Sequence, residues 1–147
     1  MRPSLALGTV QFGQPYGVCN KHGQVSLKTV RKMLNYAIDN GFDTVDTAVG
    51  YGESEKVLGQ IGVDRFNVIS KLLPMNQSQA NISEWVYEEV RSSISRLRIN
   101  NLDGLLLHRS SDLHGSEGMK LYAAIEKLKC EGLIKKFGIS IYSPSEL

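Results

Sequence analysis

Short apolar runs alternate with longer amphipathic stretches along the chain. Runs of strand length stand at residues 5–13, 42–48, 66–72, 102–109 and 135–142. Between them, apolar residues recur at the three- and four-residue spacing of a helix with one buried face, over about residues 26–41, 54–62, 81–99 and 116–131. Such alternation is typical of parallel strands joined by helices. The pattern predicts an α/β fold, for which both a doubly wound sheet and a (β/α) barrel remain open.

Helix signals mark the ends of the amphipathic stretches. Ser26 is predicted to cap the first of them and Gly41 to end it. Ser143, Pro144 and Glu146 read as an N-cap, a first-turn proline and a capping-box partner, so a further helix is predicted to begin there. A complete (β/α)8 barrel takes about 250 residues. We therefore expect residues 1–147 to form one domain, which, if it is of the barrel type, is little more than half of a barrel.

Three consecutive predicted strands each end in a polar residue, namely Asp46, Lys71 and His108. Because side chains alternate along a strand, each of these residues has a defined face, shared with the residue two positions before it. If the strands are neighbours about 4.8 Å apart in a parallel sheet, the three side chains converge at one mouth. Tyr51 lies on the adjacent glycine-flanked turn. Chemistry in barrels is placed at the carboxyl ends of the strands, so these four residues form the predicted site.

These residue types together can deliver a proton to a carbonyl oxygen. A free tyrosine hydroxyl is a poor acid at neutral pH, but a neighbouring ammonium such as that of Lys71 stabilises the phenolate. Asp46 can keep the ammonium charged and in place, while His108 can hydrogen-bond a carbonyl oxygen and orient it. We predict that Tyr51 protonates the oxygen as a hydride reaches the carbon, or acts as the base in alcohol oxidation.

Each of the four residues also has a more common structural use. An aspartate at a strand tip usually caps a helix or joins an ion pair, a lysine at a strand end is usually solvated, and a histidine at a buried edge is usually structural. Only the joint occurrence of complementary side chains at neighbouring strand ends favours a functional site.

Composition narrows the classes of partner. Lys and Arg number 17 against 15 Asp and Glu, so no strongly basic field predicts binding to nucleic acid or to an anionic membrane. No apolar run approaches the ~20 residues of a membrane span, and residues 1–4 do not lead into a signal peptide. Cys19 and Cys130 lie far apart without ligand spacing, so we expect reduced thiols, no metal site and a cytoplasmic protein.

The residues of the predicted site stand in a pattern that resembles the aldo-keto reductases. The stretch "DTAVGYGESEKVLG" (46–59) is similar to the family's Asp-Thr-Ala, two residues, Tyr-Gly, one residue, Ser-Glu, two residues, Leu-Gly. The family is also resembled by "LGTVQFG", "ISKL", "LDGLLLHR" and "EGLIKKFGIS" at the first, third, fourth and fifth predicted strands. The resemblance spans essentially the whole chain. It implies a (β/α)8 barrel, of which residues 1–147 are the N-terminal part with its first five strands. It also implies carbonyl reduction with NADPH, and a catalytic tetrad of Asp46, Tyr51, Lys71 and His108 with Tyr51 as general acid.

The resemblance also implies which residues contact the nicotinamide: Gly8, Thr9, Asp46 and Ser140. Many members of the family have Asn after the serine, whereas this chain has Ile141, which places one hydrogen bond to the carboxamide in question. In the family, the pyrophosphate, the ribose phosphate and the adenine are held by segments after the sixth to eighth strands, which these 147 residues do not include. The chain alone is therefore expected to bind NADPH weakly or not at all.

Two other functions stay open from the sequence. One is a reductase-like scaffold, non-catalytic because it lacks the cofactor clamp. The other is an aldolase that uses Lys71 to form a Schiff base, for which this lysine would have to be poorly paired with a carboxylate. As a reductase, the protein is expected to act on a small carbonyl compound or a sugar. Five barrel strands leave two open edges and an uncovered apolar face, so self-association through these edges is also expected.

Overall fold

A five-stranded parallel sheet forms the centre of the computed structural model, which describes residues 5–76 and 80–146. The strands lie in the order β1-β2-β3-β4-β5, so each neighbours the next in sequence. A doubly wound sheet reverses its strand order at a switch point, and this sheet does not. The order therefore selects the barrel type of the two predicted architectures. The strands are β1 (Ala6–Gly8), β2 (Thr44–Asp46), β3 (Asn67–Leu72), β4 (Leu102–Leu107) and β5 (Ile134–Ile139).

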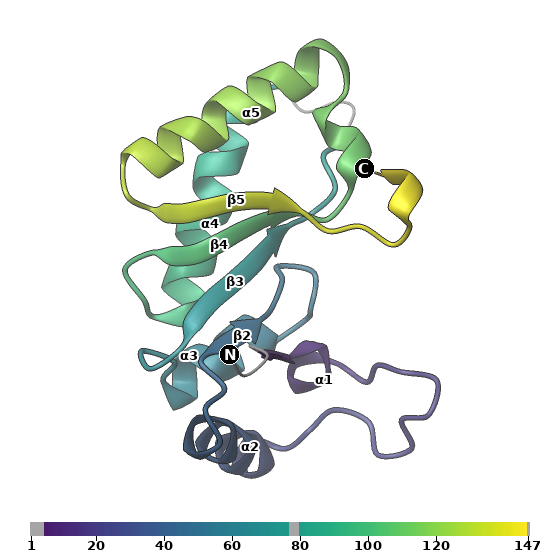
Figure 1. Cartoon of the computed structure of the whole chain (residues 1–147), viewed down its shortest axis with the longest axis vertical. Coiled ribbons are helices and arrows are strands. Elements are labelled where there is room, and N and C mark those ends of the chain that lie inside the picture. The colour runs from purple at the N-terminus through teal and green to yellow at the C-terminus, as the bar shows by residue number, and fades with distance from the viewer. Residues whose placement is uncertain (1–4, 77–79, 147) are drawn as a thin grey trace.

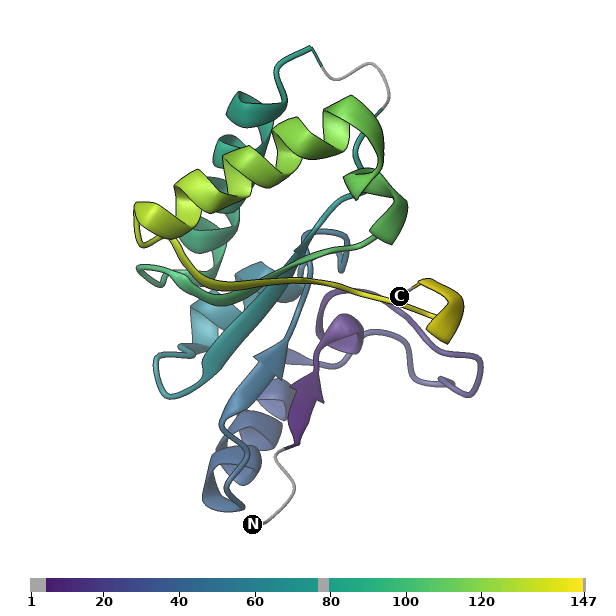
Figure 2. The ribbon, with the colours of Figure 1, turned by 45° about the horizontal axis from the view of Figure 1, so that its top comes forward.

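Every connection between successive strands contains a helix, as the sequence pattern predicts. The helices are α1 (Val10–Gly13), α2 (Leu27–Asp39), α3 (Ser54–Ile61), α4 (Ile82–Leu97) and α5 (Gly115–Cys130), with two 3₁₀ turns, η1 (Ser110–Leu113) and η2 (Pro144–Glu146). Figures 1 and 2 show α3 and α4 behind the strands, α2 beside the N-terminal strands and α5 above β5. The sheet is thus lined by helices on the side that would form the outside of a barrel.

The hydrophobic core lies between the sheet and these helices. The helical face of α2 buries Val30, Leu34 and Ala37, and the cap predicted at Ser26 is present, because its Oγ accepts a hydrogen bond from Thr29 N at 3.3 Å. Full burial of each large apolar side chain contributes about 1.5–3 kcal/mol. The largest fully buried apolar side chains include Phe12, Leu58, Leu72, Leu97, Leu102, Leu105, Leu107, Leu121, Ile125, Leu128 and Ile134.

On the opposite face of the sheet lies a cavity whose lining residues all belong to strands, with none from a described helix. It has a volume of about 430 Å³ and is lined among others by Thr44, Ile69, Leu106 and Lys136. Thr44 and Ile69 each stand two positions before a residue of the predicted site, Asp46 and Lys71 respectively. Because side chains alternate along a strand, residues two positions apart lie on the same face. This face is therefore the one onto which the site residues project.

The first strand is shorter than predicted. Residues 5–13 were expected to be one strand, but pairing ends at Gly8 and Val10–Gly13 is a helical turn. The turn lets Phe12 enter the core, where it is 1% exposed, and Phe12 N donates to Thr9 O at 2.9 Å. A straight strand would have carried Phe12 past the end of the sheet.

The C-terminal predictions also need correction. β5 ends at Ile139, and Tyr142 is 86% exposed instead of belonging to the strand. The helical start predicted after Ser143 is present, by contrast, as the 3₁₀ turn η2. Glu146 Oε1 accepts hydrogen bonds from the backbone N–H groups of Tyr142 and Ser143, both at 2.9 Å, and the second is the predicted capping-box bond. In α2, Met33 stands in the apolar pattern of the predicted helix but is 38% exposed, so the buried face of the helix is narrower than its apolar pattern.

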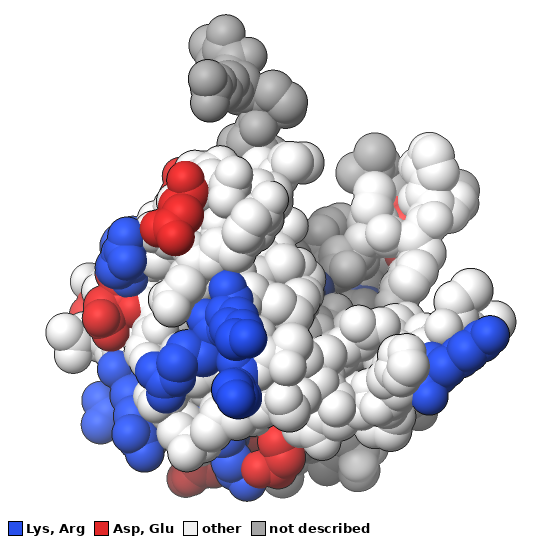
Figure 3. All heavy atoms as spheres, turned by 90° about the horizontal axis from the view of Figure 1, so that it is seen from below, with Lys and Arg blue, Asp and Glu red and all other residues white. Residues whose placement is uncertain are grey.

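Charge is mixed on the surface seen from below the molecule. Basic side chains gather over part of this face, and acidic side chains lie around them (Figure 3). Among the residues that the structure describes, no helix combines the length and the apolar character needed to cross a membrane.

Candidate active site

The parallel register brings Asp46 and Lys71 to the same end and the same face of the sheet. Asp46 pairs with Ile69 across β2 and β3, so Lys71 lies two residues further along on the same face. Lys71 Nζ donates a hydrogen bond to Asp46 Oδ1 and another, at 3.0 Å, to Thr47 O. Lys71 is only 5% exposed. The buried ammonium is therefore neutralised by the carboxylate of the neighbouring strand, as a buried charge requires.

Tyr51 reaches the same ammonium from the turn after β2. Lys71 Nζ lies 3.2 Å from Tyr51 Oη and 4.8 Å from the centroid of its ring. The turn itself is closed by a hydrogen bond from Tyr51 N to Ala48 O at 3.0 Å. The phenol oxygen thus lies beside the ammonium group that also contacts Asp46.

His108 completes the group from the end of β4. Its ring centroid lies 6.2 Å from that of Tyr51, with the two planes at 74°. Burial lowers the pKa of His108 below 6.5, the nearby charge of Lys71 lowers it further, and Asp46 opposes the shift. His108 is consequently neutral at neutral pH and can hydrogen-bond a carbonyl oxygen without carrying a charge of its own.

The residues predicted to contact a nicotinamide lie at the same end of the sheet, but they are not equally accessible. Gly8 is exposed, and no atom lies within 4 Å of the position that a Cβ would occupy there. Ser140 is partly exposed, with its backbone N–H bound to Leu107 O at 2.9 Å. Thr9 is fully buried and its hydroxyl donates to Asp46 O at 2.9 Å. Thr9 thus supports Asp46 from behind, and a cofactor contact from its side chain would require a different arrangement.

A buried hydroxyl cluster behind the site was not anticipated from the sequence. Ser54 Oγ lies 3.0 Å from Thr9 O and 2.9 Å from Thr9 Oγ1, and Thr47 Oγ1 donates to Ser54 Oγ at 3.1 Å. These three residues are 0% exposed. Isolated serines and threonines carry no periodic signal, so the only hints were the places of Thr47 directly after Asp46 and of Ser54 three residues after Tyr51, and Thr9 gave none.

A buried carboxylate was also missed. Glu55 is 2% exposed and accepts hydrogen bonds from Ser70, Ser93 and Arg96. One sequence signal was available, because Ser93 continues the buried stripe of α4 in the series Val86, Val90, Ser93, Leu97. A polar residue at such a position needs a buried partner.

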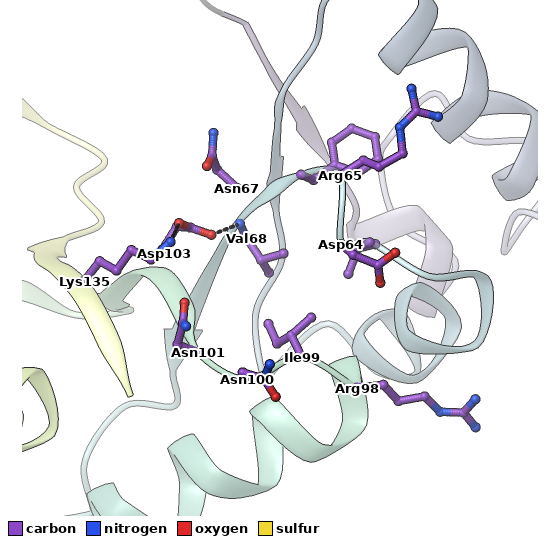
Figure 4. Close-up of a pocket in the computed structure, with 12 residues that line it drawn as sticks. Asp64, Arg65, Asn67, Val68, Arg98, Ile99, Asn100, Asn101, Asp103 and Lys135 are labelled. Atoms are coloured by element: carbon purple, nitrogen blue, oxygen red, sulfur yellow. Dashed lines mark hydrogen bonds and ion pairs between the residues drawn. The ribbon is translucent and has the colours of Figure 1, made fainter. Parts of the chain in front are cut away.

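A second polar cavity lies at the amino ends of the strands, away from the site. It has a volume of about 380 Å³ and is drawn in Figure 4. Asp103 Oδ2 accepts a hydrogen bond from Val68 N at 3.0 Å, and its Oδ1 accepts one from Lys135 Nζ at 2.6 Å. The side chains of Arg65 and Arg98 extend away from this pair. Asp103 is thus occupied by a backbone N–H and by Lys135, and the charged side chains here do not converge on a common point.

Comparison with known proteins matches the family model described as "Aldo/keto reductase family" over residues 4–147. The chain is 34% identical over 121 residues to methylglyoxal reductase YeaE of Escherichia coli and 28% identical over 119 residues to D-arabinose 1-dehydrogenase of Saccharomyces cerevisiae. These alignments cover 77% and 75% of this chain, and 39% and 36% of the respective relatives. The chain thus spans well under half the length of these curated relatives.

The fold is shared with a solved aldo-keto reductase structure. The crystal structure of an aldo-keto reductase from Klebsiella pneumoniae in complex with NADPH superposes with a TM-score of 0.73 at 27% sequence identity. The match covers 98% of this chain and 47% of that protein. The five-stranded sheet and its helices therefore correspond to about half of a (β/α)8 barrel of this kind.

Proposed function

The chain belongs to the aldo/keto reductase family, and on that premise we propose that its protein reduces a carbonyl compound to an alcohol, or catalyses the reverse oxidation, with NADPH as hydride donor. The single observation that carries this proposal is the contact of Lys71 with both Asp46 and Tyr51, at 3.2 Å from the phenol oxygen. An acid–base pair of this kind, next to a neutral imidazole, is suited to protonating a carbonyl oxygen.

Each residue of the group has a separate role in the proposed reaction. Tyr51 transfers its proton to the carbonyl oxygen while the hydride adds to the carbonyl carbon, which yields the alcohol. Lys71 stabilises the phenolate that remains, and Asp46 keeps Lys71 charged and in place. His108, held neutral by burial, donates a hydrogen bond that orients the carbonyl. Solvent protons then restore Tyr51.

The residues present fit the nicotinamide end of the cofactor. Gly8 leaves open space at the end of β1, and Ser140 is partly exposed at the end of β5. We propose that Gly8, Ser140 and the exposed part of Asp46 contact the nicotinamide. Thr9 supports this arrangement through its hydrogen bond to Asp46 O. NADPH supplies the hydride when it is bound. The groups that hold the rest of the cofactor in the family follow later strands, so we propose that residues 1–147 alone bind it weakly.

The substrate is proposed from the site and from the relatives. The relatives are named for methylglyoxal and D-arabinose, which are a small dicarbonyl and a sugar. A partly exposed tyrosine hydroxyl beside an uncovered sheet face can admit either compound. We therefore propose a small aldehyde, ketone or sugar as substrate.

The structure argues against a Schiff-base aldolase. Such an enzyme needs a lysine that spends part of its time as a free amine. Lys71 instead donates to a carboxylate, a backbone carbonyl and a phenol. All three contacts would have to be broken before the nitrogen of Lys71 could bond to a carbonyl carbon.

Replacement of Tyr51 by Phe tests the proposal most directly. We expect reduction of methylglyoxal by NADPH to fall by about 10³-fold, within the 10²–10⁴ range for the loss of a positioned acid. NADPH binding, measured by fluorescence titration of the full-length protein, should be retained, because the substitution removes only the hydroxyl, and the aromatic ring keeps its contacts with the Lys71 ammonium and the His108 ring. Undiminished reduction by the variant would show that Tyr51 is not the acid.

A further inference from the structure

Glu55 is a buried carboxylate that the proposed chemistry does not use. Its Oε1 accepts hydrogen bonds from Ser70 Oγ at 2.6 Å and Ser93 Oγ at 2.5 Å, and its Oε2 accepts one from Arg96 Nε at 2.7 Å. Burial of a charge is costly unless the charge is paired and hydrogen-bonded, and here both conditions hold. Because the donors belong to β3 and α4, Glu55 ties α3 to both of these elements.

Ser54, the preceding residue, ties α3 in a different direction. Its Oγ contacts the carbonyl and the hydroxyl of Thr9 at the end of β1, and it accepts a hydrogen bond from Thr47 after β2. Thr9 Oγ1 in turn donates to the backbone carbonyl of Asp46. Ser54 and Glu55 thus attach the first turn of α3 to the residues that follow β1 and β2, to β3 and to α4.

Both attachments end next to Tyr51, the proposed acid, or next to Lys71, which contacts it. Ser54 N donates to Tyr51 O at 3.1 Å, and Ser70 directly precedes Lys71 in β3. Thr47, which donates to Ser54, offers its carbonyl to Lys71 Nζ. Hydrogen bonds are directional, so they restrict sliding of α3 more than its apolar contacts do. The distance between Tyr51 Oη and Lys71 Nζ therefore depends on the position of α3 relative to the sheet.

We infer that Ser54 and Glu55 are positioning residues that hold the Tyr51 hydroxyl within hydrogen-bonding distance of the Lys71 ammonium. The two atoms lie 3.2 Å apart. Neither positioning residue is exposed, since Ser54 is 0% and Glu55 2% accessible, so neither touches substrate. The catalytic consequence rests on the proposed function, whereas the effect on the contact between Lys71 and Tyr51 can be measured without turnover.

Glu55→Gln tests the catalytic consequence in the full-length protein. The amide keeps the shape of the side chain but removes the charge opposite Arg96, whose Nη2 is already buried without a hydrogen-bond partner among the described residues. We expect kcat for carbonyl reduction to fall roughly 10- to 100-fold, as for a displacement on the order of 1 Å, and KM to change little. Glu55→Asp, which restores the charge, should recover part of kcat.

The matched control lies on the same turn. Glu53→Gln removes an exposed carboxylate that pairs with Lys56 at 2.9 Å, and it should leave kcat and KM unchanged. Ser54→Ala is the second test variant, because it removes the other attachment without altering any charge. It should lower kcat in the same way and by a smaller factor.

Side-chain ¹⁵N NMR of the lysine ammonium groups provides the readout that is independent of activity. The Lys71 signal is assigned by its loss in Lys71→Arg and should move in Tyr51→Phe, which removes the phenol oxygen. Glu55→Gln and Ser54→Ala should move it in the same direction, and Glu53→Gln should not.

The outcomes separate the two proposals. If Glu55→Gln and Ser54→Ala reduce stability but leave both kcat and the Lys71 signal as in the wild type, the positioning role is refuted. If Tyr51→Phe retains full activity while Glu55→Gln still moves the Lys71 signal, the proposed function fails and the structural coupling stands.

Discussion

An aspartate–lysine pair joins neighbouring strands at each end of the sheet, and the two pairs differ in what surrounds them. At the carboxyl ends, Lys71 pairs with Asp46, and the lysine side chain is 6% exposed. At the amino ends, Lys135 pairs with Asp103, and the lysine side chain is 59% exposed. The residue types are the same, but only the first ammonium is withdrawn from water and contacts a third polar group, Tyr51.

The difference explains why one end is proposed to be catalytic and the other structural. An ion pair with one exposed partner contributes at most about 1 kcal/mol and has little influence on a neighbouring group. A buried ammonium that faces a phenol acts on it through a medium of lower polarity, where the interaction is several times stronger. In barrels generally, the carboxyl end carries function and the amino end carries stability. Three experiments test whether this division holds here.

Gly13→Ala should have the largest effect, because it disturbs the backbone at the carboxyl end. A Cβ at Gly13 would lie 1.8 Å from Tyr51 O and 2.3 Å from Ser54 N. The turn that carries Tyr51 would have to move, at a cost of about 1–3 kcal/mol in the free energy of unfolding. Because the acid is displaced, carbonyl reduction per folded molecule should fall by about 10²-fold.

Gly50→Ala is the control for that substitution. It lies one residue before Tyr51, and its Cβ would meet only the side chain of Leu73, at 3.3 Å. Kinetic assays and urea unfolding of both variants should show a large effect for Gly13 and a small one for Gly50. Wild-type kcat in Gly13→Ala would contradict the tight fit between α1 and the Tyr51 turn.

Asp103→Ala should lower the free energy of unfolding without lowering the rate of carbonyl reduction per folded molecule. The substitution removes the acceptor of Val68 N, and an unsatisfied buried N–H costs about 1–3 kcal/mol. Asp103→Asn retains an oxygen acceptor and loses only the pairing with exposed Lys135, so its unfolding free energy should change by less than about 1 kcal/mol. Reduction per folded molecule should match wild type in both variants. A loss of kcat would mean that the amino end also determines the geometry of the site.

The smallest effect is expected from the ionisation of His108. Because burial and Lys71 lower its folded-state pKa below 6.5, the unfolded state binds the proton more tightly than the folded state does. Its contribution to stability is therefore complete above about pH 6.5 and is lost as the pH falls from there through the folded-state pKa. Urea unfolding between about pH 7.5 and 5 should show this loss in the wild type and a weaker pH dependence in His108→Gln. His114→Gln, which removes an exposed imidazole, is the control.

Much of the fold could be predicted from local patterns in the sequence. The helical periodicity of residues 81–99 corresponds to α4 (Ile82–Leu97), and the apolar run at 66–72 contains β3. The prediction was wrong at Val10–Gly13, because burial of Phe12 depends on a core formed by distant residues. Local periodicity carries no information about that core.

For the candidate site, the sequence identified which residue types stand at the strand ends, and the tertiary structure decided how they are used. Alternation along each strand is a local property, but it predicts a shared face for Asp46, Lys71 and His108 only if their strands are parallel neighbours, and the order β2-β3-β4 in the folded sheet supplies that condition. The position of α3 could not be predicted in this way. Its residue Glu55 accepts hydrogen bonds from Ser93 and Arg96, which lie 38 and 41 positions further along the chain. Such partners are chosen by packing between elements, and only the folded chain determines which buried polar groups meet.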